Sequence, residues 1–141
     1  MKTTFHDPLE FDVIGSGLGC PEGPVICDDG SVMCVDIDSG RILRIADGVV
    51  STVAKPGGGP NGLAIGPDGL GYVANNGGFL WTEVGGIRLP MDLATHSNEP
   101  PEFEGGWIES VDLTTGDVTV LARSCGAHRL TGPNDLIFDD D

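Results

Sequence analysis

The stretch that decides the fold is PEGPVICDDGSVMCVDI, residues Pro21 to Ile37, and the chain repeats its pattern twice. The second copy is GPNGLAIGPDGLGYVANN from Gly59, and the third is GPNDLIFDDD from Gly132. Each copy opens with a proline and a polar residue, continues into an apolar run and reaches an acidic turn. The three polar residues are Glu22, Asn61 and Asn134. Self-similarity of this kind indicates a repeat architecture.

The first two copies are predicted to be β-hairpins. Aligning Glu22 with Asn61 places Gly30 on Gly69, so DDG and PDG fall at the same turn, where glycine accepts positive φ. The segments after the turns, SVMCVDI and LGYVANN, carry the β-branched and apolar residues expected of strands. Two more alternating runs follow in each unit, RILRI and VVSTVA in the first, WIESVDL and VTVLA in the second. Each complete unit therefore supplies four strands.

Four-stranded antiparallel units that recur along a chain are typical of β-propeller blades, because each twisted sheet buries its faces against neighbouring blades. A β-sandwich of similar strand count is the alternative, and the repeated polar residue at each opening favours the propeller. We expect an all-β fold with a first blade at about residues 18–56, a second at about 57–124 and the start of a third at about 130–141.

Two further features concern the limits of these units. The third unit stops at Asp141, where its turn glycine would come next, and an unpaired strand would expose its backbone groups. Residues 1–141 are therefore expected to be a partial, truncated propeller domain. In the second unit, residues 79–106 form an insertion rich in Pro and Glu, and both a lid over the propeller channel and a plain solvated loop remain open for it.

Composition excludes several partners. The formal net charge of −15, with no Lys or Arg cluster to offset it, repels phosphate backbones, so nucleic acid is not an expected partner. No segment approaches the roughly 20 apolar residues of a membrane span, and the start of the chain lacks the apolar core of a secretion signal. The acidity is interpreted as a solvated surface, with carboxylates gathered for a cation as the alternative.

The cysteines indicate a reducing compartment. Four of them at irregular spacing are too few for a disulfide scaffold, and no C-x-x-C pair suggests zinc. Cys27 and Cys34 flank a tight turn, and we expect them to be reduced rather than joined across the hairpin. The protein is therefore expected to be cytoplasmic.

The polar residues at the openings are candidate ligands. Glu22 enters an apolar strand, where a carboxylate must face solvent or be held by a cation or by hydrogen-bond donors. Asn134, followed by Asp135, holds the equivalent place in the third unit. Oxygen atoms converging from different blades would suit Ca²⁺, whereas zinc favours thiolate and imidazole ligands. Solvent exposure is the alternative for Glu22, and local turn bonds are the alternative for Asn134 and Asn61.

Other catalytic and cofactor motifs are missing. No serine lies in a G-x-S-x-G elbow, and His6, His96 and His128 have no partner at metal or triad spacing. The glycine-rich GGGP at residues 57–60 lacks the Lys-Ser/Thr of a phosphate loop. Nucleotide binding is therefore excluded, and a glycine-rich connection between blades explains this segment better.

These motifs resemble the SMP-30/gluconolactonase family. The segment LGCPEGPVICDDGSVMCVDIDSGRILRI is similar to the opening blade of that family, with its E-G-P motif, a hairpin, a V-D-I segment around Asp36 and a G-R-I run. GPNGLAIGPDGLGYVAN and TGPNDLIFDD resemble the second and third blade openings, especially in the gluconolactonase branch. The resemblance covers Leu18 to Asp141 and implies a six-bladed β-propeller, of which this chain holds the first two to three blades.

The resemblance also implies a metal site at one end of the channel, with Ca²⁺ as the expected cation and Zn²⁺, Mg²⁺ and Mn²⁺ as alternatives. By motif, Glu22 matches the ligand glutamate, and Asn134 matches an asparagine that binds metal in some members and substrate in others. Asp135 matches the adjacent supporting aspartate. Asn61 lies at a blade opening near the channel, and no ligand role carries over to it. Asn61 and Asp135 are expected to support the metal ligands or to bind substrate.

The function implied by the resemblance is hydrolysis of a lactone or similar ester, in which the cation polarises the substrate oxygen and orients water. The resemblance assigns no catalytic residue within the chain. It places two further ligands, an Asn and an Asp, beyond Asp141, so the chain alone is expected to be inactive. The alternative is a non-catalytic propeller that binds a protein or a small ligand through its channel face.

Overall fold

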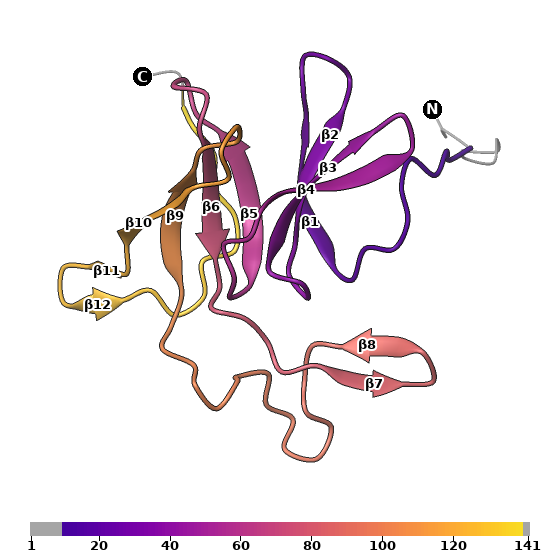
Figure 1. Ribbon diagram of the computed structural model, residues 1–141. Coiled ribbons are helices and arrows are strands. Elements are labelled where there is room, and N and C mark those ends of the chain that lie inside the picture. The colour runs from indigo at the N-terminus through magenta and orange to yellow at the C-terminus, as the bar shows by residue number, and fades with distance from the viewer. Residues whose placement is uncertain (1–9, 140–141) are drawn as a thin grey trace, which may run out of the picture.

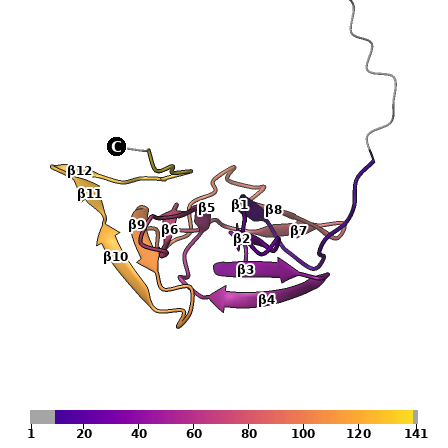
Figure 2. The same cartoon turned by 90° about the horizontal axis from the view of Figure 1, so that it is seen from above.

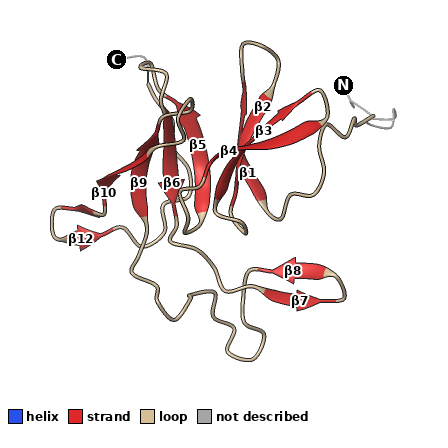
Figure 3. Ribbon diagram, viewed as in Figure 1, coloured by secondary structure: helices blue, strands red, loops and turns tan. Residues whose placement is uncertain are grey.

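The computed structural model describes residues 10–139, which form β-strands joined by loops and turns (Figures 1 and 3). Residues 1–9, which include His6, and residues 140–141, which end the third unit, lie outside the described residues. Within residues 10–139, no helix is long and apolar enough to cross a membrane. The prediction of an all-β fold is confirmed.

The first unit forms a four-stranded antiparallel sheet in which each strand pairs with the next one along the chain. Short turns join the strands, and the DDG turn between the first two has Gly30 at a φ of 81°. The strands are β1 (Pro21–Ile26), β2 (Val32–Asp36), β3 (Arg41–Ala46) and β4 (Val49–Ala54).

The second unit forms a sheet of the same kind, with the order β5-β6-β9-β10. Its strands are β5 (Pro60–Ile65), β6 (Gly71–Asn75), β9 (Trp107–Val111) and β10 (Val118–Ala122). Two small hairpins lie outside the sheets. One, β7 (Thr82–Val84) with β8 (Ile87–Leu89), lies in the insertion, and the other, β11 (Ser124–Cys125) with β12 (His128–Arg129), precedes the third opening.

The hairpins that open the two sheets, β1–β2 and β5–β6, have equivalent hydrogen bonds at their turns. At the turns, the Gly30 N–H donates to the Cys27 carbonyl and the Gly69 N–H donates to the Gly66 carbonyl, both at 2.9 Å. Gly69 has a φ of 79°, close to that of Gly30. The alignment of the DDG and PDG turns is therefore confirmed.

The same equivalence holds at the other end of each hairpin. The Cys20 N–H donates to Asp36 Oδ1 at 2.7 Å, and the Gly59 N–H donates to Asn75 Oδ1 at 2.9 Å. These two pairs occupy matching places in the repeat. The repeat found in the sequence thus corresponds to a repeated local structure.

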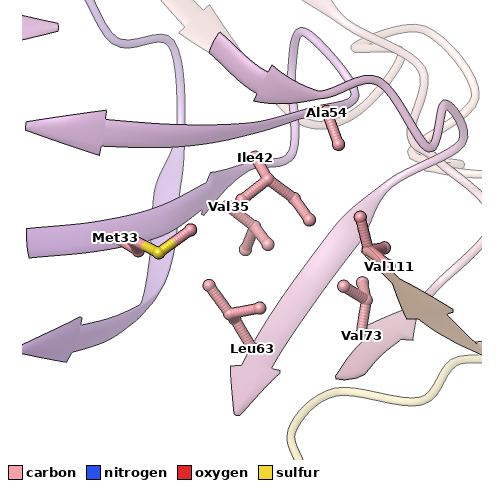
Figure 4. Packing of buried hydrophobic residues seen from close by; sticks show 7 residues of the cluster. All are labelled: Met33, Val35, Ile42, Ala54, Leu63, Val73 and Val111. Carbon is pink, nitrogen blue, oxygen red and sulfur yellow. The ribbon is translucent and has the colours of Figure 1, made fainter. Parts of the chain in front are cut away.

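The main hydrophobic core lies between the two sheets, which stand next to each other with β1 and β5 in contact (Figures 2 and 4). Strands of both sheets contribute buried side chains to it. These are Met33, Val35, Ile42, Ala54, Leu63, Val73 and Val111. Two four-stranded sheets that bury faces against each other are consistent with neighbouring propeller blades. The number of blades in a complete domain stays a prediction.

Cys27 and Cys34 lie on opposite faces of the first sheet. Cys27 packs against the core between the sheets, whereas Cys34 belongs to a second cluster with Leu43 and Ile45. A disulfide requires the two Cβ atoms to approach within about 3.5–4.5 Å, which side chains on opposite faces of a sheet do not do. Both cysteines carry free thiols.

Candidate functional site

The three repeat openings lie side by side because two glycines let neighbouring backbones approach closely. A Cβ atom on Gly23 would lie 2.6 Å from the backbone nitrogen of Leu63 in β5. A Cβ atom on Gly62 would lie 2.6 Å from the Cα atom of Asp135 in the third opening. Only glycine permits such contacts. The segments that carry the predicted site residues are therefore adjacent in space.

The side chains of Asn61 and Asn134 meet directly. Asn61 Nδ2 donates a hydrogen bond to Asn134 Oδ1 at 2.9 Å, and both residues line one pocket of about 250 Å³. Asp135 Oδ1 instead accepts the backbone N–H of its neighbour Leu136 at 2.8 Å. The structure thus brings together the second and third openings, which are far apart in the sequence.

Glu22 faces a different environment. It is exposed at the start of β1 and lines a second, larger pocket of about 430 Å³ on the outer side of the first sheet, together with Leu18 and Ile45. The 250 Å³ pocket does not include it. Among residues 10–139, no three or more His, Cys, Asp and Glu side chains gather into a metal site. The assignment of Glu22 and Asn134 as joint ligands stays a prediction.

The donor atoms at the openings nevertheless have the chemistry that a hard cation prefers. Glu22 offers carboxylate oxygens and Asn134 an amide oxygen, and Ca²⁺ binds oxygen ligands of both types. The lining of the 250 Å³ pocket contains amide, hydroxyl and carboxylate groups, and among these described residues it holds neither thiol nor imidazole. The residues present therefore fit Ca²⁺ or Mg²⁺ better than zinc.

The insertion at residues 79–106 forms one wall of the 250 Å³ pocket. It contributes Phe79 and Phe103 together with the polar residues Asn98 and Glu99. Its hairpin β7–β8 lies below the first sheet in Figure 1, and its Arg88 donates to Asp38 of the first unit at 2.7 Å. The insertion therefore contributes one wall of the candidate site, while most of its own residues are exposed to solvent.

A buried polar network behind this pocket was missed by the sequence analysis. Asn75, at the end of β6, is fully buried, and its Nδ2 donates to the Gly57 carbonyl and to Glu109 Oε1, both at 2.9 Å. Its Oδ1 accepts the backbone N–H groups of Gly59 at 2.9 Å and Gly77 at 3.0 Å. Every hydrogen-bonding atom of this side chain is used. Asn75 thereby fixes the glycine-rich segments that border the site.

Glu109 anchors that network from β9. Its carboxylate is 1% exposed, and the indole N–H of Trp107 donates to its second oxygen at 2.5 Å. Burial raises the pKa of Glu109, while the hydrogen bonds from Asn75 and Trp107 oppose that rise. Arg123 lies over the Trp107 ring, with its Cζ atom 4.6 Å from the ring centre. One signal was available in the sequence, since Glu109 shares a face of the strand WIESVDL with the apolar Trp107 and Val111.

Asp36, the counterpart of Asn75 in the first unit, has a structural role. It is almost fully buried and accepts hydrogen bonds from the backbone of Cys20 and from Ser39 Oγ. Burial acts to raise the pKa of Asp36, but these hydrogen bonds and the nearby Arg41 outweigh it and lower that pKa. The V-D-I motif therefore stabilises the hairpin base.

The geometry of the repeat agrees with a comparison against protein families. The sequence model of the SMP-30/Gluconolactonase/LRE-like region matches residues 20–141. The chain belongs to this family. The resemblance seen in its three blade openings is thus confirmed, and its two antiparallel sheets are consistent with part of a gluconolactonase-like propeller. A search of curated proteins finds no match to the chain.

Proposed function

We propose that this chain is part of a divalent-metal-dependent hydrolase that opens lactones or related esters. The observation that carries the proposal is the junction of the second and third openings, where Asn61 and Asn134 are hydrogen-bonded beside a pocket. Membership in the SMP-30/gluconolactonase family supports the same reaction class. Fold alone does not fix function, so the proposal rests on these side chains.

Glu22 and Asn134 are the proposed metal ligands, with Ca²⁺ as the preferred cation. When bound, the cation would supply a positive charge that polarises the substrate carbonyl. Asn61 orients Asn134, because its Nδ2 occupies one side of Asn134 Oδ1 at 2.9 Å. A carbonyl oxygen has two lone pairs, so the other one stays available for a cation. Asp135 is proposed to support this segment through its own backbone contact with Leu136.

The test is calorimetric titration with calcium of the wild-type chain and two variants, Glu22→Gln and Asn134→Ala. The control is Glu83→Gln, which makes the same change as Glu22→Gln on an exposed residue of β7. The same set is measured in the product of the complete reading frame that contains residues 1–141. We expect both ligand variants to lose the binding that the control retains. Equal binding by all four proteins would overturn the metal assignment, and no binding by any would favour a ligand-binding propeller.

A cytoplasmic location belongs to the same proposal. Cys27 and Cys34 pack on opposite faces of one sheet, so the chain does not use them as a disulfide clamp. A tagged copy expressed from its own gene should be recovered in the cytosolic fraction. Recovery in the medium or in a periplasmic fraction would contradict this location.

A further inference from the structure

Asn76 carries a buried hydrogen-bond donor at the edge of the 250 Å³ pocket. Its side chain is 5% exposed, and Nδ2 has no hydrogen-bond partner among residues 10–139. The residue lines the same pocket as Asn61 and Asn134. Native proteins pair nearly all buried polar groups, so an unpaired one calls for a specific explanation.

The orientation of this amide is fixed by its neighbours. Asn76 Oδ1 accepts the backbone N–H of Gly78 at 2.8 Å, and the Asn76 backbone N–H donates to the Gly59 carbonyl at 2.8 Å. Turning the amide over would set its NH₂ group against the Gly78 N–H, which is also a donor. Gly59 packs so tightly that a Cβ atom there would lie 2.1 Å from Asn76 Oδ1. The free donor is therefore Nδ2.

The repeat shows that the fold does not require an amide at this place. The matching residue in the first unit is Ile37, whose backbone N–H donates to the Cys20 carbonyl at 3.0 Å, as that of Asn76 does to Gly59. Ile37 is also buried, at 4% exposure. An apolar side chain thus serves the hairpin equally well. The polar side chain of Asn76 is explained by the pocket, which Asn76 lines and Ile37 does not.

The pocket limits what the donor can meet. Its volume of about 250 Å³ lies below the roughly 300–1,000 Å³ of common ligand sites, which suits a single ring. Phe79 and Phe103 offer apolar faces, and amide groups supply polar contacts. Gly78, at a φ of 99°, lines the pocket next to Asn76 and adds no side chain to it.

We infer that Asn76 determines specificity, with Nδ2 donating a hydrogen bond to an oxygen of a small, neutral, single-ring compound rich in oxygen. The substrate class within that description, a lactone, rests on the proposed function. A neutral amide pairs with a carbonyl or hydroxyl oxygen without the charge that would retain a carboxylate. Opening a lactone with water breaks the acyl C–O bond and yields a hydroxy acid, whose carboxylate the acidic chain repels. The negative charge of the chain would therefore favour release of the product, while the Asn76 donor would hold the neutral substrate.

Side-chain amide NMR tests this inference with little spectral overlap. The chain has five asparagines and no glutamine, so the carboxamide region of a ¹⁵N spectrum contains only five side-chain NH₂ groups. The Asn76 signal is identified by its loss in Asn76→Asp. The probe is D-glucono-1,5-lactam, a hydrolysis-resistant ring with a carbonyl acceptor, titrated with calcium present and again with the calcium chelated. We expect the Asn76 signal of the wild-type chain to shift as the lactam binds.

The variants give the second measurement. Asn76→Asp replaces the donor with an acceptor while keeping the bond from the Gly78 N–H, and should weaken lactam binding roughly tenfold or more. Ser97→Asp adds the same charge in the neighbouring insertion without removing that donor, and should bind the lactam as the wild type does. Thermal melts of both variants verify folding. If Asn76→Asp does not fold, the Asn76 signal is assigned instead by correlating each side-chain amide with its own backbone in the wild-type protein, and the wild-type titration provides the readout.

The outcomes separate this inference from the proposed function. The role of Asn76 would be overturned if the lactam did not bind, if the Asn76 signal did not shift, or if Ser97→Asp weakened lactam binding as much as Asn76→Asp does. Lactam binding that shifts Asn76 in a protein that binds no divalent cation would overturn the metal-dependent hydrolase and leave the role of Asn76 intact. Calcium binding that depends on Asn134, together with an Asn76 signal that does not shift, would support the metal-dependent hydrolase and overturn the role of Asn76.

Discussion

Replacing Gly62 with alanine should separate Asn61 from Asn134 while leaving the two sheets in place. Gly62 is not among the glycines with positive φ, so alanine fits its backbone conformation. The added Cβ atom would lie 2.6 Å from the Cα atom of Asp135 and 2.9 Å from the carbonyl oxygen of Asn134. Both are backbone atoms, which cannot turn aside as a side chain does. The third opening must therefore move.

The size of that movement follows from the contact distances. Carbon atoms in contact lie about 3.5–4.0 Å apart, so the third opening must shift by roughly 1 Å. The hydrogen bond from Asn61 to Asn134, now 2.9 Å, would stretch to roughly 3.9 Å, beyond the range of a hydrogen bond. Overpacking of this kind costs about 1–3 kcal/mol in unfolding free energy. Calcium affinity should fall as well, because Asn134 moves with the segment.

Urea unfolding and side-chain amide NMR measure the two effects. The control is Gly71→Ala, whose Cβ atom would first meet the side chain of Leu113 at 2.9 Å, a group that can turn away. We expect the Asn61 and Asn134 amide signals to move in Gly62→Ala and to stay in Gly71→Ala. Unchanged amide signals and an unchanged urea midpoint in Gly62→Ala would refute the close packing of the second and third openings.

Three further predictions concern the core and the buried network. Ile42→Ala, in the core between the sheets, should lower the unfolding free energy in urea by about 2–5 kcal/mol, whereas Ile26→Ala, at a residue 80% exposed, should stay within about 0.5 kcal/mol. Because burial raises the folded-state pKa of Glu109 above its unfolded value, the stability that Glu109 contributes is greatest below its unfolded pKa and is lost as pH rises through the folded one. The stability of the wild-type chain relative to Glu109→Gln should therefore decrease with rising pH, and a pH-independent difference in thermal melts would contradict this. Asn75→Asp should lower the unfolding free energy by at least about 2 kcal/mol, because it places a second carboxylate beside Glu109 and removes a hydrogen-bond donor. The control is the reverse change at the matching residue of the first unit, Asp36→Asn, which introduces no such repulsion. Equal melting temperatures for Asn75→Asp and the wild type would refute the network.

The repeat made much of the fold predictable. The turn glycines Gly30 and Gly69 and the alternating runs around them define hairpins locally, so their pairing could be inferred without any distant contact. The same alignment located the residues at the three openings. The equivalence of Asp36 and Asn75, and their burial, became evident only in the structure.

The arrangement of the site was less predictable because it depends on contacts between distant segments. Asn75 and Glu109 are 34 residues apart, and Asn61 and Asn134 are 73 apart, so no local pattern reports either pair. The strand β1 also has an irregularity in its pairing directly after Glu22, and such bulges re-aim side chains. An alignment of repeats does not reveal a change of direction at one residue.

The role of the insertion at residues 79–106 was undetermined for a similar reason. Its composition fits a lid and a solvated loop equally well, and only its contacts distinguish them. The contact of Arg88 with Asp38 and the position of Phe103 in the pocket lining depend on where the segment returns to the sheets. The role inferred for the Asn76 amide depends on the same segment, because the insertion and Asn76 line one pocket.

The central claim is that this chain takes part in metal-dependent lactone hydrolysis, and a pH-stat assay tests it most directly. The product of the complete reading frame containing residues 1–141 is mixed with D-glucono-1,5-lactone, first with calcium and then after removal of divalent cations by a chelator. We predict acid release well above the uncatalysed rate, loss of that excess on chelation, recovery when calcium is restored, and no excess in Asn134→Ala. Hydrolysis that survives chelation and the Asn134→Ala change, or the absence of any excess from a protein that binds calcium, would contradict the account.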